Sequence, residues 1–187
     1  MFIEIKNFFS DDFCDEIIEQ CSSCIDKNKV SIEYNREGNT VDFKEHEKLQ
    51  ELDKKIFDKL TLFLQRKILY SFNIAGMQVK DSGYSFHRYE KGDKLYTHCD
   101  EVFNHNPESI IFHPRILSIV VNLTNNENAD LIFPRHNKAI KSEKGKLIAF
   151  LPHSCYEHYM NNKSDKNRDV LVTWLLDSNI ECRVKNG

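Results

Sequence analysis

The sequence predicts an α+β fold in which N-terminal helices pack on one sheet of a double-stranded β-helix (jelly roll), and three observations lead to it. Apolar residues recur at helical spacing in two stretches up to Tyr70. After Tyr70 the pattern changes to short β-rich runs separated by Gly, Pro, Asn, Asp and Lys. Two helices followed by about eight strands are typical of helices covering one face of a double antiparallel sheet.

The length and composition predict a single domain. The chain has 187 residues, of which 40% are hydrophobic and 29% charged, and a chain of this size buries enough apolar surface for one core. No repeat, low-complexity segment or linker divides it. We expect one domain over residues 1–187, with helical support at about residues 1–75 and a jelly-roll core at about residues 76–180.

The charge and the start of the sequence restrict partners and location. The net charge of -3 gives no basic field that would hold nucleic acid or an anionic membrane. No apolar stretch reaches the length of a membrane span, and the first residues lack the features of a signal peptide. We therefore expect a cytoplasmic protein whose six scattered cysteines are reduced thiols.

Two helices are expected in the first part of the chain. Residues 2–9, FIEIKNFF, alternate like a strand, and Ser10 then supplies an N-cap for a helix with an acidic first turn. The second helix runs from about residue 47 to residue 70. The apolar stripes are Phe13, Ile17, Cys21 and Ile25 in the first helix, and Leu49, Leu52, Ile56, Leu60, Phe63 and Leu64 in the second.

The rest of the chain reads as strands. The runs have β-branched and aromatic residues and are bounded by turn residues. They lie at residues 77–89, 94–101, 115–124, 129–135, 138–142, 146–152, 157–162 and 169–176.

The run YEKGDKLYTHCDE, residues 89–101, carries the main functional signal. His98 and Asp100 lie two positions apart in a stretch that also reads as a strand, so we expect their side chains on one face. Imidazole and carboxylate together suit a divalent metal such as Fe(II), and two His with one carboxylate leave coordination positions open for substrate and oxygen.

A second imidazole has to come from elsewhere among the eight histidines. His158 lies between two expected strands, and His153, beside Pro152, is the alternative ligand. Arg168 follows ten residues after His158. In an antiparallel strand pair with a tight connection, this interval returns a guanidinium close to the metal.

Three segments resemble the iron(II)- and 2-oxoglutarate-dependent dioxygenases, specifically their prolyl 4-hydroxylase-like branch. Residues 89–101 resemble the family's segment of Tyr, Gly and His-x-Asp. Residues 129–135 and 141–152 resemble its central strands, and residues 157–174 resemble its second His, a basic residue ten positions on and a closing Trp. The resemblance covers about residues 84–176.

This resemblance implies a catalytic set and its cofactors. His98, Asp100 and His158 would hold Fe(II), and Arg168 would pair with the distal carboxylate of 2-oxoglutarate. A planar guanidinium binds a carboxylate through two charge-assisted hydrogen bonds, which suits that role. The implied cofactors are Fe(II) and 2-oxoglutarate, with ascorbate as an optional third.

Two further residues are candidates for contact with 2-oxoglutarate, and two features depart from the family. Tyr89 would donate its hydroxyl to the cosubstrate, and Asn122 is a second candidate for this contact. Residues 128–130, Asn-Ala-Asp, stand where the family often has paired Gly, and Arg168 replaces the Lys of the collagen-type enzymes. The departures weaken any inference of a collagen-like substrate.

The implied activity is hydroxylation of an unactivated C–H bond, with molecular oxygen as co-reactant and succinate as coproduct. Because Asp100 is present where halogenating relatives lack the carboxylate, halogenation is not expected. A prolyl residue in a peptide or protein is the first candidate substrate, and a free amino acid or other small metabolite is the alternative. A non-catalytic jelly-roll binding module is a third hypothesis. Residues 101–114 are placed where a substrate lid would lie.

The remaining Cys and His residues give no second site. Cys21 and Cys24 are spaced like zinc or redox ligands, but no second close pair follows, so a plain helix face is expected. Surface, loop or substrate-pocket positions are expected for the histidines outside the matched spacing, which are His87, His105, His113 and His136.

Overall fold

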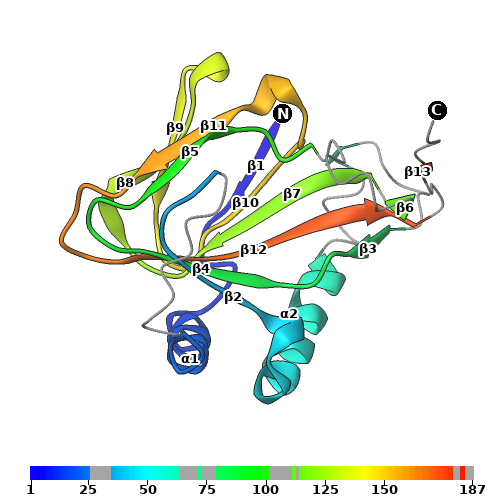
Figure 1. Ribbon diagram of the computed structural model, residues 1–187, viewed down its shortest axis with the longest axis vertical. Helices are drawn as coiled ribbons and strands as arrows, with labels where there is room; N and C mark the ends of the chain where they lie inside the picture. Colours follow the sequence, from blue (N-terminus) through cyan, green and yellow to red (C-terminus); the bar gives the residue numbers. More distant parts are fainter. Residues whose placement is uncertain are drawn as a thin grey trace.

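A computed structural model describes residues 1–25, 35–63, 71–72, 79–101, 111–112, 114–178 and 182–183 of the chain. Within these ranges two antiparallel sheets face each other, and two helices cover the outer face of the larger sheet (Figure 1). The α+β jelly roll with helices on one sheet, expected from the order of the elements, is confirmed.

The larger sheet, here called the major sheet, contains seven strands. Strand β12 (Arg168–Asp177) lies near its centre and pairs with β7 (Arg115–Asn122), β4 (Ser85–Tyr89) and β3 (Val79–Asp81). Beyond β7 lie β10 (Leu147–Phe150) and β1 (Phe2–Ile5), and beyond β4 lies β2 (Asn39–Asp42). The N-terminal region is therefore more than helical support, because β1 and β2 form strands at the two ends of this sheet.

The smaller sheet, here called the minor sheet, has the strand order β5 (Lys94–His98), β11 (His158–Asn161), β8 (Asn126–Phe133) and β9 (Lys138–Ser142). Strands β6 (Ile111–Phe112) and β13 (Cys182–Arg183) pair separately. Short 3-10 turns η4 (Pro134–His136) and η5 (Ser154–Tyr156) follow β8 and precede β11. The expectation that Arg168 returns along a strand paired with that of His158 is wrong, because β11 belongs to the minor sheet and β12 to the major sheet.

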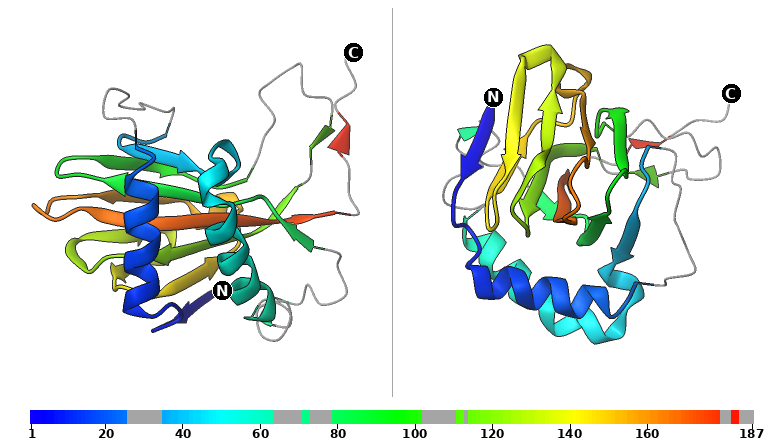
Figure 2. Two further views of the ribbon diagram at one scale, coloured as in Figure 1. Left: turned by 90° about the horizontal axis from the view of Figure 1, so that it is seen from below. Right: turned by 90° about the vertical axis from the view of Figure 1, so that its left-hand side faces the viewer.

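Helices α1 (Asp11–Ser22) and α2 (Gln50–Phe63) pack on the face of the major sheet that points away from the minor sheet (Figure 2). Ser10 caps α1 as predicted, since its hydroxyl accepts a hydrogen bond from the backbone N–H of Phe13. The chain enters α2 through the 3-10 turns η1 (Phe43–Glu45) and η2 (Glu47–Leu49), so the helix begins slightly later than predicted. Its predicted end at residues 64–70 lies outside the described residues.

Two apolar cores result from this layering. One lies between the helices and the major sheet and includes Ile17, Ile56 and Phe86. The other lies between the two sheets and includes Phe133, Phe150 and Met160. Burial of each such side chain contributes roughly 1.5–3 kcal/mol to folding. The second core ends where polar residues take over the space between the sheets, and that end contains the candidate site.

Asn162 fixes the connections that carry the chain from one sheet to the other. Its side-chain amide donates to the backbone carbonyls of Tyr89 and Lys166, at 2.9 Å in both cases. The backbone carbonyl of Asn162 accepts the backbone N–H of Gly92 at 2.8 Å. Gly92 adopts a φ of 93°, which favours glycine, so the turn from β4 to β5 is well defined. The side chain and the backbone of this one buried residue therefore hold both connections that lead to site residues.

Residues 35–42 bridge the two sheets at their other edge. The backbone of Asn35 and Glu37 pairs with β5 through hydrogen bonds of 2.7 and 2.8 Å, and the chain then continues as β2 beside β4. A Cβ atom at Gly38 would lie 2.6 Å from the carbonyl oxygen of Arg88, so only glycine fits there. This crossing brings Arg36 to the space between the sheets. Neither described helix has the length and apolar character of a membrane span.

Candidate metal centre and its cavity

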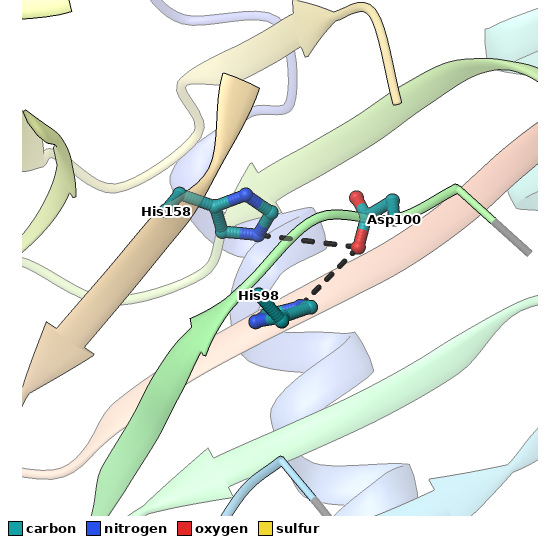
Figure 3. A group of neighbouring side chains, drawn as sticks. All are labelled: His98, Asp100 and His158. Carbon is teal, nitrogen blue, oxygen red and sulfur yellow. Dashed lines mark ion pairs between the residues drawn. The ribbon is translucent and has the colours of Figure 1, made fainter. Parts of the chain in front are cut away.

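Three side chains converge between the sheets, as Figure 3 shows: His98, Asp100 and His158. Their potential ligand atoms all lie within 4.8 Å of one another. Oδ1 of Asp100 is 3.3 Å from Nε2 of His98 and 4.0 Å from Nε2 of His158. Two imidazoles and a carboxylate at this spacing could hold one divalent metal ion.

Strand pairing explains why residues sixty positions apart meet here. His158 begins β11 and lies opposite His98, the last residue of β5, with their ring centroids 4.4 Å apart. A register shift follows His158 along β11. Asp100 is two residues beyond the end of β5, so it reaches the site from the chain leaving the strand, and the predicted common strand face applies only as far as His98.

Both histidines present the same nitrogen to the site. Nδ1 of His98 lies 2.8 Å from the carbonyl oxygen of Tyr96, and Nδ1 of His158 lies 3.0 Å from that of Tyr156. A carbonyl can only accept, so in each ring Nδ1 carries a proton, and in the neutral form of the ring the lone pair is on Nε2. A hydrogen bond from Nδ1 to a backbone carbonyl fixes the orientation of a metal-binding imidazole. The donor set therefore fits a metal such as Fe(II).

The electrostatics of the group favour an ionised Asp100 beside a neutral His158. Burial alone would raise the pKa of Asp100, but its interactions with His158 and His98 outweigh that effect and place the pKa below the usual range. Burial lowers the pKa of His158, although the charge of Asp100 acts against it. Deprotonated Nε2 atoms and an ionised carboxylate are the forms that bind a metal.

The alternative ligand His153 lies outside this group. Its side chain is 53% exposed, and its Nδ1 is 3.6 Å from Oε1 of Glu101. His136 packs its ring against Phe2 and Tyr156 instead of lining the site. The predicted positions of His105 and His113 lie outside the described residues, as does most of the expected lid at residues 101–114.

Arg168 lies in the same cavity and has no carboxylate partner among the described residues. It is 2% exposed. Nη2 donates to Oδ1 of Asn122 at 3.3 Å, while Nε is buried without a hydrogen-bond partner. Burial lowers the pKa of Arg168, and the charges around it only partly offset that effect. An unsatisfied buried guanidinium costs free energy unless a ligand supplies the anion, so the site fits a carboxylate-bearing cosubstrate.

The two other predicted cosubstrate residues lie on either side of Arg168. Tyr89 is buried, lines the cavity, and has its ring centroid 5.9 Å from Cζ of Arg168. Asn122 is buried too, but it is not among the cavity-lining residues. Its position suggests that it orients the guanidinium and does not touch the cosubstrate.

The cavity has a volume of about 240 Å³, and its walls combine the metal group, Arg168 and apolar side chains such as Val120, Leu131 and Val170. Sequence reasoning missed two arginines in its lining, Arg36 and Arg115, whereas His87 lies in the pocket, one of the positions expected for it. His87 is buried, with Nε2 3.2 Å from Nη1 of Arg36 and Nδ1 3.3 Å from Oγ1 of Thr40. Arg115 could have been noticed as a charged residue directly before a strongly apolar run.

Among the described residues, Cys21 and Cys24 form no second metal group. Cys21 is buried in the core on α1, and burial raises the pKa of its thiol to about 12. Sγ of Cys24 lies 3.5 Å from the carbonyl oxygen of Gln20. The plain helix face preferred from the sequence agrees with these contacts.

Comparison with known proteins identifies the fold. No family model and no curated protein matches the sequence. Among solved structures, a viral collagen prolyl hydroxylase from Paramecium bursaria Chlorella virus-1, in complex with 2-oxoglutarate, is similar with a TM-score of 0.68 and 20% identity, over 94% of this chain and 95% of that one. A prolyl hydroxylase from Trichoplax adhaerens, in complex with a hypoxia inducible factor peptide, is similar with a TM-score of 0.67 and 17% identity, over 95% of this chain and 84% of that one.

A third similar structure is that of a carbocyclase, an enzyme with a different reaction from the two prolyl hydroxylases. The non-heme α-ketoglutarate-dependent carbocyclase SnoK from nogalamycin biosynthesis has a TM-score of 0.61 and 15% identity, over 95% of this chain and 79% of that one. At these identities the likeness establishes the fold, which this chain shares with 2-oxoglutarate-dependent oxygenases along nearly its whole length.

Proposed function

We propose that the protein is an Fe(II)- and 2-oxoglutarate-dependent dioxygenase that hydroxylates an unactivated C–H bond. One observation carries the proposal: a buried guanidinium without a carboxylate partner, Arg168, shares a cavity with the group His98, Asp100 and His158. A metal site alone has many uses. A metal site next to an unpaired buried cation suits a cosubstrate that chelates metal at one end and has a carboxylate at the other.

Each residue has a defined task in this proposal. His98, Asp100 and His158 hold the metal, and Arg168 binds the distal carboxylate of 2-oxoglutarate with its fork. Tyr89 donates its hydroxyl to the same cosubstrate. The apolar walls of the cavity exclude water. When bound, the iron and 2-oxoglutarate supply the oxidising chemistry, with ascorbate as an optional reductant.

The first test separates metal binding from cosubstrate binding. Asp100→Ala should lose iron, measured by metal analysis, while circular dichroism shows a retained fold. Arg168→Leu should keep iron but weaken 2-oxoglutarate binding by about 2–5 kcal/mol, measured calorimetrically with an inert metal. Arg168→Lys should be milder because it keeps the charge and loses the fork. The matched control is Arg135→Leu, which removes an exposed arginine paired with Glu157.

The second test concerns turnover. Wild-type protein should form succinate from 2-oxoglutarate only when iron and oxygen are both present. A non-catalytic binding module would give no succinate under any of these conditions. Unchanged 2-oxoglutarate affinity in Arg168→Leu would contradict the cosubstrate assignment, and Lys166 would be the next cation to test. Arg88 is a poor substitute because it is paired with Asp169.

For the substrate, we propose a prolyl residue in a peptide or protein as the first candidate. The fold shared with two prolyl hydroxylases supports it. A free amino acid or other small metabolite is the second candidate, supported by the additional arginine in the cavity wall, Arg115. Peptides and free amino acids should be compared for stimulated succinate formation and for a mass gain of one oxygen atom. The cytoplasmic location and the single-domain organisation over residues 1–187 stay predictions from the sequence.

A further inference from the structure

The substrate side of the cavity carries more positive charge than the proposed cofactors would neutralise. Arg115 and Arg168 both line the cavity, and Asp100 is the one carboxylate among its described lining residues. In the proposed function Asp100 binds the metal and 2-oxoglutarate binds Arg168. Arg115 then faces the remaining space with its charge still to be balanced.

Arg115 is held in place by neutral partners. Its Cζ lies 3.6 Å from the centroid of the Trp174 ring, and its Nη1 donates to the backbone carbonyl of Asp100 at 3.1 Å. No described carboxylate forms an ion pair with it. Stacking on an indole fixes the plane of a guanidinium without using its N–H donors. Several donors of Arg115 thus stay available in a rigid orientation, close to the metal group.

Arg115 also lines a second hollow beside the metal cavity. This hollow of about 320 Å³ is partly formed by Arg36, Arg115 and Trp174, which line the metal cavity as well. Its other walls include Asp42, Lys44 and Ser85. Burial lowers the pKa of Arg115, and the charge of Asp100 only partly opposes this. The guanidinium of Arg115 therefore belongs to the walls of both hollows.

We propose that Arg115 binds a carboxylate of the substrate, so that the substrate is an acid whose reacting C–H bond lies near that carboxylate. This inference rests on the proposed dioxygenase function and specifies its substrate class. A planar fork with free donors is suited to a carboxylate, and a partly buried site strengthens the pairing. The carboxylate belongs either to a small free acid, such as an amino acid, or to an acidic residue in a peptide.

The test uses Trp174, the single tryptophan of the chain, as a fluorescent reporter at the site. Protein loaded with an inert divalent metal and saturating 2-oxoglutarate is titrated with a panel of N-acetyl-L-amino acids and with the matching amides. The members of each pair differ in one charge. We expect at least one acid to give a saturable change with an affinity about tenfold or more above its amide, which corresponds to ~1.4 kcal/mol.

Two variants assign this preference to Arg115. Arg115→Gln should reduce binding of the acid to the level of the amide, whereas Arg115→Lys should keep part of the preference because it keeps the charge. Arg135→Gln is the matched control and should behave like wild type. Amides that bind as well as acids in wild type, or an acid preference that survives in Arg115→Gln, would overturn the inference. If Arg115→Gln does not fold, the wild-type ratio alone decides.

Two additional arms identify the source of the carboxylate and separate this inference from the proposed function. Amidated peptides Gly-Pro-Glu and Gly-Pro-Gln are compared in the same assay, and tighter binding of the Glu peptide assigns the carboxylate to a peptide. Tighter binding of the free acids assigns it to a small molecule. Succinate formation is measured on the iron-loaded protein. Carboxylate-dependent fluorescence without succinate would contradict the dioxygenase activity and leave the anion site in place, while succinate with equal acid and amide binding would contradict this inference alone.

Discussion

Two arginines on opposite faces of the major sheet, Arg88 and Arg168, differ in the partner that each one has. Arg88 on β4 faces the helices, where Nε and Nη2 each donate to a carboxylate oxygen of Asp169 at 2.8 Å. Arg168, directly beside Asp169 on β12, faces the cavity and has the amide of Asn122 as its hydrogen-bond acceptor. The strand register aligns Asp169 with Arg88 and Arg168 with Tyr89, so the two environments are one residue apart.

The difference separates a structural charge from one that suits a ligand. On the helix face the chain supplies its own carboxylate, in a bidentate geometry that satisfies the guanidinium. On the cavity face Arg168 is more deeply buried, and no described carboxylate pairs with it. A buried guanidinium without a carboxylate partner costs free energy that an anionic ligand would offset, which supports the proposal that a carboxylate binds at Arg168.

Breaking the satisfied pair should have the largest effect on stability. Asp169→Ala removes the carboxylate and leaves the mostly buried Arg88 without its partner, so we expect a loss of about 3 kcal/mol in the free energy of unfolding. The measurement is urea denaturation of the ligand-free protein. The double variant Arg88→Met, Asp169→Leu should recover most of the loss. A loss below about 1 kcal/mol would mean that the pair behaves like an exposed one.

Removing Arg168, which has no carboxylate partner among the described residues, should increase the free energy of unfolding. Arg168→Met replaces a buried cation that lacks a carboxylate partner with an apolar side chain of similar length, so the ligand-free protein should gain about 1–2 kcal/mol. With an inert metal already bound, addition of 2-oxoglutarate should raise the melting temperature of wild type by more than that of the variant. A ligand-free variant less stable than wild type would show that Arg168 contributes to folding as Arg88 does.

The sequence predicted the residues of the site better than the path that joins them. His98, Asp100, His158 and Arg168 lie in one cavity because their order and spacing reflect strands of a jelly roll. The path was mistaken, since His158 and Arg168 were assigned to paired strands and lie in different sheets. Spacing along a chain does not specify whether a connection is a hairpin or crosses between layers. Contacts such as those of Asn162 decide this, and they are not visible in a pattern.

The sequence pattern also did not predict that Arg36, Arg115 and Trp174 line the cavity. Arg36 reaches the cavity because residues 35–42 cross between the sheets, and that crossing depends on backbone pairing with β5. Arg115 and Trp174 meet across the pairing of β7 with β12. A contact between residues far apart in the chain leaves no periodicity, so tertiary pairing had to be known first.

His87, in the wall of the cavity, should make the stability of the protein depend on pH, with a smaller effect than the two arginine substitutions. Burial, together with the charges of Arg36 and Arg168, holds the pKa of His87 well below its ordinary value of 6.5. The unfolded chain therefore binds a proton that the folded chain does not, and this group destabilises the fold as the pH falls below 6.5. Between pH 7.5 and 5.5, wild type should lose about 1.4 kcal/mol more than His87→Gln. Equal losses in urea titrations of the ligand-free proteins would mean that His87 is protonated in the fold.

The smallest expected effect comes from giving the cavity face the carboxylate that it lacks. Asn122→Asp changes the hydrogen-bond acceptor of Arg168 into an anion with almost no change in shape, which makes the pair resemble Arg88 and Asp169. The internal carboxylate then competes with 2-oxoglutarate for the same guanidinium. We expect an affinity for 2-oxoglutarate about fivefold lower, equivalent to ~1 kcal/mol, and a ligand-free protein about 1 kcal/mol more stable.

Asn122→Leu is the matched variant, because it removes the acceptor without adding a charge. It should leave Arg168 less well oriented, so that both 2-oxoglutarate affinity and stability decrease. The two substitutions thus share a loss of affinity and differ in the sign of the stability change, which calorimetry and urea denaturation measure separately. If Asn122→Asp destabilises the protein as Asn122→Leu does, an internal carboxylate does not satisfy Arg168, and the missing carboxylate partner would no longer support the proposal that a ligand binds on this face of the sheet.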